Sequence, residues 1–338
     1  MDNEFNHMNA IVYTQYGPPD VLQLKEVTKP IPKDDEVLAR VRATSVNRTD
    51  CANLTAKPFI MRFSLGFFKP DKQILGTEFS GDVESVGKDV TSFKVGDKVF
   101  GFDDSVLSSY AEYMVISENN ALATMPKDIT YEQAAGCIEG AHYAYNFINK
   151  VDLKSGDKVC VNGASGGIGS AMVQLVKHFG GDITAVCNTK NIELVKSLGA
   201  NRVIDYTKDD FTKDTERFDF VFDSVGKSSF GKCKTILKPG GVYISSELGK
   251  RSENLLFSLT TAIFGSMPGS QGKKVKFPYP PDRKRSVLLI KKLFEEGKYK
   301  SVIDRTFSLE RIADAFNYVL KGQKTGNVVI TVGDDAGI

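Results

Sequence analysis

The sequence has few of the residues from which metal sites and disulfide frameworks are built. Its 338 residues include 5 cysteines and 3 histidines. The cysteines are scattered, and no two of them form a Cys-x-x-Cys pair. This pattern argues against a structural zinc lobe and against a disulfide scaffold. We therefore expect a reduced protein with a cytoplasmic location.

The chain also lacks a strong charge imbalance and a long apolar run. A formal net charge of +2 gives no global attraction to nucleic acid or to an anionic membrane. No run reaches about 18 uninterrupted apolar residues, so no membrane-spanning helix is expected. The first ten residues carry acids and no apolar segment, which is unlike a secretory signal. The length and the hydrophobic content of 41% are typical of a globular protein with two domains.

Two different sequence patterns divide the chain into a first and a second segment. Residues 8 to about 125 hold short β-branched and aromatic runs separated by Gly, Pro, Asp and Asn, which indicates a β-rich segment. From about residue 130, strand-like runs alternate with helices expected at 168–180, near 190–198 and near 229–237. Such alternation predicts βαβ units and a parallel sheet. After about residue 280, a helix and a second helical segment precede a last strand, "GNVVITV".

The stretch "GASGGIG", residues 163–169, places four glycines between a β-branched run and an amphipathic helix. Glycine at 166 allows the backbone to approach a pyrophosphate, and glycine at 169 allows the helix to pack against the sheet. The helix N-terminus then offers free N–H groups to the anion. The pattern predicts a dinucleotide site at Ser165, Gly166, Gly167 and Ile168, although the turn alone reports binding and not catalysis.

The residues after the second strand of this unit indicate which dinucleotide binds. An acidic residue there would hold the ribose diol of NAD(H). The sequence instead reads "CNTKN", with Asn188, Thr189 and Lys190 and no acid. A cation and a hydroxyl suit a 2′-phosphate, so NADP(H) is the predicted cofactor. The alternative is that Lys190 simply begins a solvated helix.

Several stretches together resemble one family. They are "SVNRTD" (45–50), "ILGTEFSGDVESVGKDVTSFKVGDKVFG" (74–101), "NGASGGIGSAMVQLVK" (162–177), "LGANRVIDY" (198–206), "DSVG" (223–226) and "TGNVVI" (325–330). The chain resembles the zinc-independent quinone oxidoreductase branch of the medium-chain dehydrogenase/reductase superfamily. The resemblance implies an α/β fold with two domains. A GroES-like catalytic domain would comprise 1–127 and 280–338, and a Rossmann domain with a doubly wound parallel sheet would comprise 128–279. Nicotinamide and substrate would lie between them.

The resemblance also allows a test for metal, because zinc alcohol dehydrogenases share the fold. Their catalytic cysteine would fall at Asn47 and their histidine at Thr77, and neither residue type is a normal zinc ligand. The third ligand would fall near Cys137 or Ile138. We therefore expect no metal. Reductive chemistry follows, in which NADPH delivers hydride to a quinone or to an α,β-unsaturated carbonyl.

The resemblance and the strand ends supply the remaining candidate residues. Asn47 is expected at the nicotinamide ribose or the substrate carbonyl, Asp50 is either catalytic or a helix cap, and His142 either orients substrate or packs a helix start. Strand ends that face the ligand in open α/β sheets add further cofactor candidates: Tyr206, Ser224, Val225, Gly226 and Ser245. In the superfamily that the chain resembles, some enoyl reductases use a tyrosine shortly after the Asn-x-x-Asp motif as proton donor. The corresponding stretch here, "CANLTAKPF", contains no tyrosine. We therefore expect solvent to protonate the product.

Two apolar stretches, 56–70 and 254–272, are expected to wall or cover a hydrophobic substrate, with Phe59, Phe63 and Phe264 as candidate contacts. Core packing or oligomer contacts are equal alternatives, and contact with a membrane surface is a third. The segment "KKVKF" (273–277) is a candidate edge strand for a homodimer. The expected partner is a small hydrophobic carbonyl or quinone, with no nucleic acid.

Two other functions stay open. One is a zinc-type alcohol dehydrogenase, which would contain about one zinc per chain. The other is a non-catalytic NADPH-binding sensor or structural protein, which the glycine turn alone does not exclude.

Overall fold

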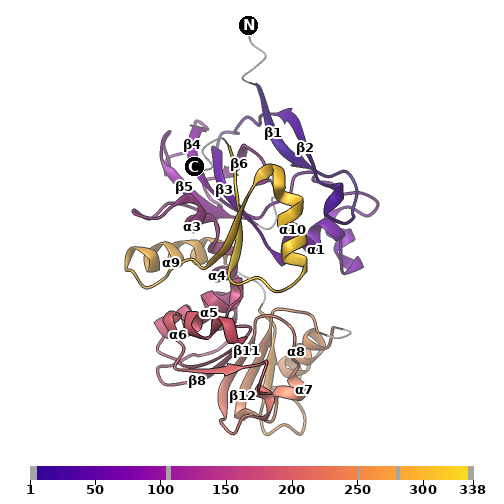
Figure 1. Cartoon of the computed structure of the whole chain (residues 1–338), viewed down its shortest axis with the longest axis vertical. Coiled ribbons are helices and arrows are strands. Elements are labelled where there is room, and N and C mark those ends of the chain that lie inside the picture. Colours follow the sequence, from indigo (N-terminus) through magenta and orange to yellow (C-terminus); the bar gives the residue numbers. More distant parts are fainter. Residues whose placement is uncertain (1–5, 104–107, 250–251, 279–281, 334–338) are drawn as a thin grey trace. The chain divides into compact units, whose positions relative to one another are not determined.

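The computed structural model describes residues 6–103, 108–249, 252–278 and 282–333. The chain divides into two compact units: a first unit of residues 1–139 with 283–338, and a second unit of residues 140–282 (Figure 1). The domain limits expected from the sequence, at 127/128 and 279/280, stay predictions. Of these, residues 279 and 280 lie outside the described residues.

The first unit is built around an open sheet of seven strands, which meet in the order β14-β15-β3-β4-β5-β7 with β6 paired to β3. Their bounds are β3 (Glu36–Val46), β4 (Glu78–Val86), β5 (Lys98–Phe102), β6 (Tyr113–Ser117), β7 (Leu122–Thr124), β14 (Ile303–Ser308) and β15 (Asn327–Thr331). A separate antiparallel pair joins β1 (His7–Val12) to β2 (Gln23–Thr28). The expectation of a β-rich segment over 8–125 is confirmed.

Both ends of the chain contribute to the first unit's sheet. β15 pairs antiparallel with β3 and parallel with β14, so the yellow C-terminal strand lies inside the sheet in Figure 1. Helix α10 (Ile312–Leu320) buries Ile312, Ala315, Phe316 and Val319, a spacing that places one apolar stripe against the core. The other helices of this unit are α1 (Arg48–Thr55), α2 (Arg62–Leu65), α3 (Tyr131–Ala135) and α9 (Arg283–Glu295), with short 3₁₀ turns η2 (Pro19–Val21), η3 (Phe59–Met61) and η7 (Leu309–Arg311).

The second unit is a six-stranded parallel sheet with the order β10-β9-β8-β11-β12-β13. This is the doubly wound order of a Rossmann fold, with its switch point between the first and fourth strands. The strands are β8 (Lys158–Asn162), β9 (Asp182–Cys187), β10 (Arg202–Asp205), β11 (Phe218–Asp223), β12 (Leu237–Ser245) and β13 (Lys274–Lys276). The helices are α5 (Gly167–His178), α6 (Ile192–Leu198), α7 (Phe230–Cys233) and α8 (Glu253–Phe264), with η4 (Thr189–Asn191) and η5 (Phe211–Lys213) between strands. Helix α4 (Ile138–Ile148) begins at the limit between the units.

One helix expected from the sequence is much shorter in the structure. The segment near 229–237 holds a helix only over Phe230–Cys233, and Leu237 already pairs with Phe218 in the sheet. Burial of Ile236 and Leu237 outweighs their helical propensity, and Pro239 disfavours a helical residue before it. The expected helices at 168–180 and 190–198 are confirmed as α5 and α6.

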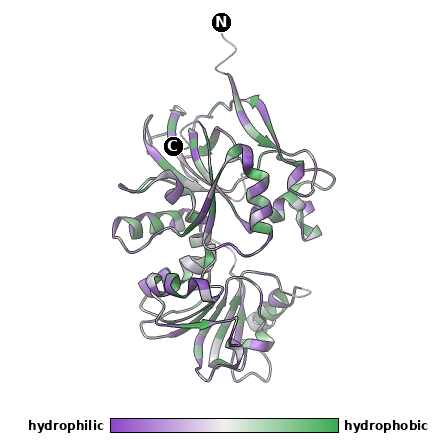
Figure 2. Ribbon diagram, in the orientation of Figure 1, coloured by the Kyte–Doolittle hydropathy of each residue, from purple (hydrophilic) through white to green (hydrophobic). Residues whose placement is uncertain are grey.

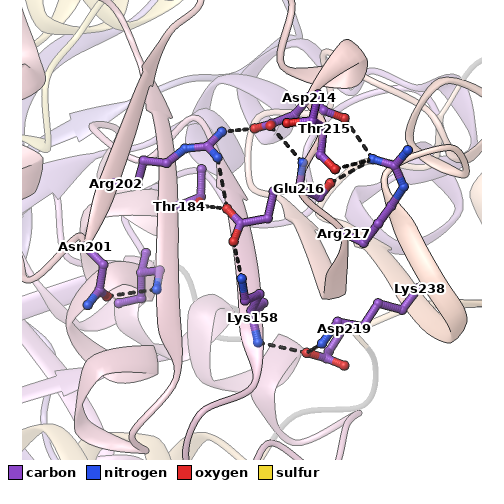
Figure 3. A network of polar contacts seen from close by, with 11 residues as sticks. Lys158, Thr184, Asn201, Arg202, Asp214, Thr215, Glu216, Arg217, Asp219 and Lys238 are labelled. Carbon is purple, nitrogen blue, oxygen red and sulfur yellow. Dashed lines mark hydrogen bonds and ion pairs between the residues drawn. The ribbon is translucent and has the colours of Figure 1, made fainter.

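Ion pairs tie the amino-terminal ends of the second unit's strands together (Figure 3). Glu216 accepts hydrogen bonds from Lys158 at the start of β8 and from Arg202 at the start of β10, the latter at 2.9 Å from Nη1 to Oε2. Lys238 pairs with Asp219 at 2.6 Å. These ion pairs lie at the edge of the sheet opposite the carboxyl-terminal ends of the strands, where ligands of open α/β sheets bind.

Hydropathy follows this architecture. Figure 2 shows hydrophobic residues on strands of both sheets and mixed faces on the helices around them. Within the described ranges, none of the helices combines the length and the apolar character needed to cross a membrane.

Candidate functional site

The glycine turn lies between β8 and α5, as the sequence indicates. Gly169 is packed tightly, because a Cβ atom there would lie 2.0 Å from the carbonyl oxygen of Gly163. Gly166 is different: its φ is −79°, and the nearest atom to an added Cβ is 3.6 Å away. The protein therefore leaves space at Gly166, where the pyrophosphate is expected, and fills the space at Gly169.

The end of β9 carries the residues expected to select the dinucleotide. The Oδ1 atom of Asn188 is buried and has no hydrogen-bond partner within the described part of the chain. Thr189 donates its hydroxyl to Asp205 at 2.5 Å, and the Lys208 ammonium lies 3.8 Å from the same carboxylate. Lys190 is exposed. Asp205, which ends β10, is thus engaged by protein groups, and that hydroxyl bond lowers its pKa.

The ends of β11 and β12 hold the other cofactor candidates. Ser224 donates to the Asn162 carbonyl at 2.8 Å, and Asp223 accepts from the Asn162 amide at 2.9 Å and from the Tyr243 hydroxyl at 3.0 Å. Gly226 has a φ of +62°, a conformation that favours glycine. Val225 and Ser245 adjoin these residues, and Tyr206 follows β10 with an exposed ring. All follow strands at the carboxyl edge of the parallel sheet, as the glycine turn does.

His142 lies on α4 and is fully buried. Its Nε2 atom is 3.3 Å from the side-chain nitrogen of Asn146, and its ring contacts Tyr143 edge-on. These contacts describe the packing role considered from the sequence. A role in orienting substrate stays a prediction.

In the first unit, Asn47 begins helix α1 at the end of β3. Its side-chain nitrogen lies 2.9 Å from the Ser45 hydroxyl, 3.0 Å from Glu78 Oε1 and 3.1 Å from Glu139 Oε2. Asp50 accepts the Asn47 backbone N–H at 2.8 Å, which is the helix-capping role that the sequence offered as one alternative. Asn47 therefore connects β3 and α1 to carboxylates from β4 and α4.

Thr77 points to the same carboxylate as Asn47. Its hydroxyl donates to Glu139 Oε2 at 2.5 Å. The third zinc-ligand position was expected near Cys137 or Ile138, but the Cys137 thiol bonds the Ala134 carbonyl at 3.1 Å and Ile138 is an apolar buried side chain. The next residue, Glu139, is the one that meets Asn47 and Thr77. Among the described residues, no group of three His, Cys, Asp or Glu side chains is arranged to hold a metal ion.

Burial and mutual repulsion make these carboxyl groups weak acids. Desolvation and the neighbouring Glu139 raise the pKa of Glu78 to about 7. Desolvation also raises the pKa of Glu139 and, together with the Glu139 charge, that of Asp50. Desolvation lowers the pKa of Lys324, which Glu139 partly offsets. Glu78, Glu139 and Lys324 were missed as site residues, because only the folded chain brings them to Asn47.

The phenylalanines of 56–70 form an exposed cluster around η3 and α2. Phe59 and Phe63 stack edge to face with Phe67, and Phe63 is 74% exposed. In the second unit, α8 leaves Phe264 70% exposed. The alternative that these phenylalanines are plain core is wrong, because their rings face solvent within each unit. β13 is an edge strand as expected; its use in a homodimer stays a prediction.

Known proteins resemble the chain over almost its whole length. Residues 33–127 match the alcohol dehydrogenase GroES-like domain and 198–330 match the zinc-binding dehydrogenase family. A 2-methylene-furan-3-one reductase of Solanum lycopersicum is 34% identical over 96% of this chain and 79% of its own. The chain belongs to the medium-chain dehydrogenase/reductase superfamily. An NADPH-dependent alkenal/one oxidoreductase of Arabidopsis thaliana, a chloroplastic protein, is 32% identical over the same shares.

A solved structure agrees with this membership. The quinone oxidoreductase of Coxiella burnetii superposes with a TM-score of 0.84 at 26% identity, covering 97% of this chain and 100% of that one. The predicted fold, with a GroES-like unit and a Rossmann unit, is confirmed. As a medium-chain dehydrogenase/reductase of the quinone and enone group, the chain is an oxidoreductase that uses a nicotinamide cofactor. The cytoplasmic location stays a prediction.

Proposed function

We propose that this enzyme uses NADPH to reduce quinones or α,β-unsaturated carbonyls, without a metal ion. The observation that carries the proposal is the convergence of Asn47 and Thr77 on the Glu139 carboxylate. In a zinc alcohol dehydrogenase these positions would supply metal ligands that polarise an alcohol. Here Asn47 and Thr77 both donate hydrogen bonds to the Glu139 carboxylate, so a substrate with its own electron-poor carbon is the better hydride acceptor.

The second unit's residues suit a dinucleotide with a 2′-phosphate. The open space at Gly166 accommodates a pyrophosphate beside the N-terminus of α5. The Oδ1 atom of Asn188 is a buried acceptor without a partner among the described residues, and a ribose hydroxyl of the cofactor could donate to it. Lys190 and Lys208 flank this point, and a phosphate would receive charge-assisted hydrogen bonds from them. The bound cofactor supplies the hydride.

The remaining candidates have distinct proposed tasks. Ser224, Val225, Gly226 and Ser245, at the ends of β11 and β12, would line the nicotinamide half of the cofactor. Asn47, Asp50 and His142 would border the reacting groups. Phe59, Phe63 and Phe264 would contact a hydrophobic acceptor, since exposed apolar patches commonly mark binding surfaces. We also propose a homodimer formed through β13.

The test is NADPH oxidation by the purified enzyme against a panel of acceptors. The panel contains a naphthoquinone, an ortho-quinone, an alkenal, a vinyl ketone and a simple aldehyde, and each is repeated with NADH and after treatment with a chelator. We expect turnover with quinones or enones, faster with NADPH than with NADH, and unaffected by the chelator.

Two results would replace the proposal. Activity confined to the aldehyde and abolished by the chelator, together with about one zinc per chain, identifies a zinc-type dehydrogenase. Tight NADPH binding without turnover of any acceptor identifies a non-catalytic NADPH-binding protein.

A further inference from the structure

A group of large apolar side chains in the first unit faces solvent just after α1 in the chain (Figure 1). Phe68 is 87% exposed and Phe63 is 74% exposed. Phenylalanine is among the residues most often buried in a folded domain. A contiguous group of exposed apolar side chains, unlike a single one, marks an interaction surface. We call this group the aromatic patch, and its members are Phe59, Ile60, Phe63, Phe67 and Phe68.

The aromatic patch is held in place by the rest of the first unit. The Tyr16 hydroxyl donates to the Gly66 carbonyl at 2.7 Å, and Leu65 packs against the core of the unit. Within the patch, the rings of Phe63 and Phe67 meet edge to face with their centroids 5.6 Å apart, a geometry that aromatic pairs prefer. The segment is therefore anchored on its core side, while the phenylalanine rings stay at the surface.

Positive charge borders the aromatic patch. Residues 57–72 contain four basic side chains and one acidic side chain, in a chain whose net charge is only +2. Lys57 and Lys69 are exposed just outside the two ends of the patch in the sequence. Arg62 lies within it, with its guanidinium carbon 5.5 Å from the centroid of the Phe59 ring. Aromatic and basic side chains together are typical of surfaces that enter the headgroup region of an anionic bilayer.

The same charge argues against a second copy of this chain as the partner of the aromatic patch. In a two-fold dimer the patch of one copy would face the same patch of the other, and the basic side chains around the two patches would repel each other. An anionic lipid surface carries the complementary charge. Beneath its headgroups it also offers an apolar layer for the phenylalanine rings.

We propose that the aromatic patch docks the first unit onto an anionic lipid surface, with the phenylalanine rings at the acyl chains and Lys57 and Lys69 at the lipid phosphates. The docking itself does not depend on the proposed function. One consequence rests on that function: docking brings the enzyme to quinones or enones that are dissolved in the lipid, so the hydrophobic acceptor comes from the membrane.

Tryptophan fluorescence tests the docking without turnover, because the sequence contains no tryptophan. The variant Phe68→Trp is mixed with phosphatidylcholine vesicles, with and without phosphatidylglycerol, and with the same lipids brominated in their acyl chains. With the anionic vesicles we expect a blue-shifted emission that brominated lipids quench, and both effects should weaken as salt is added. Ile31→Trp, at an 81% exposed position between β2 and β3, is the matched control and should show neither effect.

Sedimentation with vesicles tests the apolar and the basic contributions separately. Ile60→Ser should lower the partition coefficient for anionic vesicles about tenfold, because an apolar side chain no longer enters the lipid. Lys69→Gln should lower it about fivefold, the scale of one basic residue near such a surface. Ile31→Ser and Lys94→Gln change exposed residues of the same types elsewhere in the first unit, and they should bind as the wild type does.

Turnover tests the consequence. The wild-type enzyme should reduce a quinone with a long isoprenoid chain faster in anionic than in neutral vesicles, while a water-soluble short-chain quinone should be reduced at the same rate with either. Equal rates for the long-chain quinone, despite docking, overturn this consequence alone. Docking without turnover of any acceptor contradicts the proposed function and leaves the docking standing.

Two results overturn the docking itself. The first is an emission of Phe68→Trp that no vesicle shifts and no brominated lipid quenches. The second is a blue shift that appears without vesicles and grows with protein concentration, which would identify a contact between copies of this chain.

Discussion

The Thr77 hydroxyl lies 2.5 Å from Glu139 Oε2, to which it donates a hydrogen bond. In a zinc enzyme of this fold, a histidine ligand would stand at the position of Thr77. The hydroxyl is buried, so its bond to the carboxyl is sheltered from competing water. A metal ion would have to displace this bond and the neighbouring bond from Asn47. In this structure both side chains therefore serve as hydrogen-bond donors to the Glu139 carboxyl.

The two glycines of the turn provide a matched pair of substitutions. Gly166→Ala should fold normally, because its φ of −79° and the 3.6 Å clearance accept a methyl group, yet it should raise the Kd for NADPH about tenfold or more, equal to about 1.4 kcal/mol. Gly169→Ala should lower the free energy of unfolding by about 1–3 kcal/mol through overpacking. Fluorescence titration and denaturant unfolding measure the two effects. Equal loss of stability in both variants would contradict the assignment of the pyrophosphate position.

Cofactor preference should depend on the lysines near Asn188. Lys190→Ala is expected to raise the KM for NADPH about tenfold, the scale of one charge-assisted hydrogen bond, and to leave the KM for NADH unchanged. Adding Lys208→Ala should increase the effect. Lys196→Ala, on the exposed face of α6, is the control. A parallel change in both KM values would show that Lys190 does not contact a 2′-phosphate.

The buried carboxyl groups of Glu78 and Glu139 should make the free energy of unfolding depend on pH. The pKa of Glu78 rises from 4.5 to about 7 on folding, so the folded state holds a proton that the unfolded chain has released. The stabilisation is present below about pH 4.5 and is lost as the pH rises through about 7, by up to about 3 kcal/mol. Urea unfolding at several pH values should show this decline in the wild type.

The variant Glu78→Gln isolates the contribution of the pair. This variant loses hydrogen bonds at every pH. Its free energy of unfolding should nevertheless decline less between pH 5 and pH 8 than that of the wild type. Glu310→Gln, which changes an exposed carboxylate, should keep the wild-type slope. A Glu78→Gln slope as steep as that of the wild type would place the proton uptake elsewhere.

Sequence patterns predicted the scaffold well, because the scaffold depends on local periodicity and on short motifs. The glycine turn, the alternating strands and the buried strand β15 each carry their signal within about ten residues. Helix α7 was overestimated, since the burial of Ile236 and Leu237 in the sheet is a tertiary effect.

The carboxyl cluster could not be predicted in the same way. Glu78 and Glu139 are 61 residues apart in the chain, and Lys324 follows far beyond both. Nothing in the neighbourhood of Glu139 marks it as buried, whereas its partner Asn47 lies in a recognisable motif. The zinc-ligand comparison came within one or two residues of Glu139, but it searched for metal ligands and not for a proton-binding group.

The position of β15 in the first unit's sheet has a consequence for biosynthesis. β3 is synthesised before the second unit, but one of its pairing partners, β15, is synthesised after that unit. The second unit, a continuous segment, is synthesised entirely in between. It is therefore able to fold on the nascent chain, while this edge of β3 stays open until β15 has been synthesised. A chain truncated before residue 327 would leave that edge exposed to aggregation.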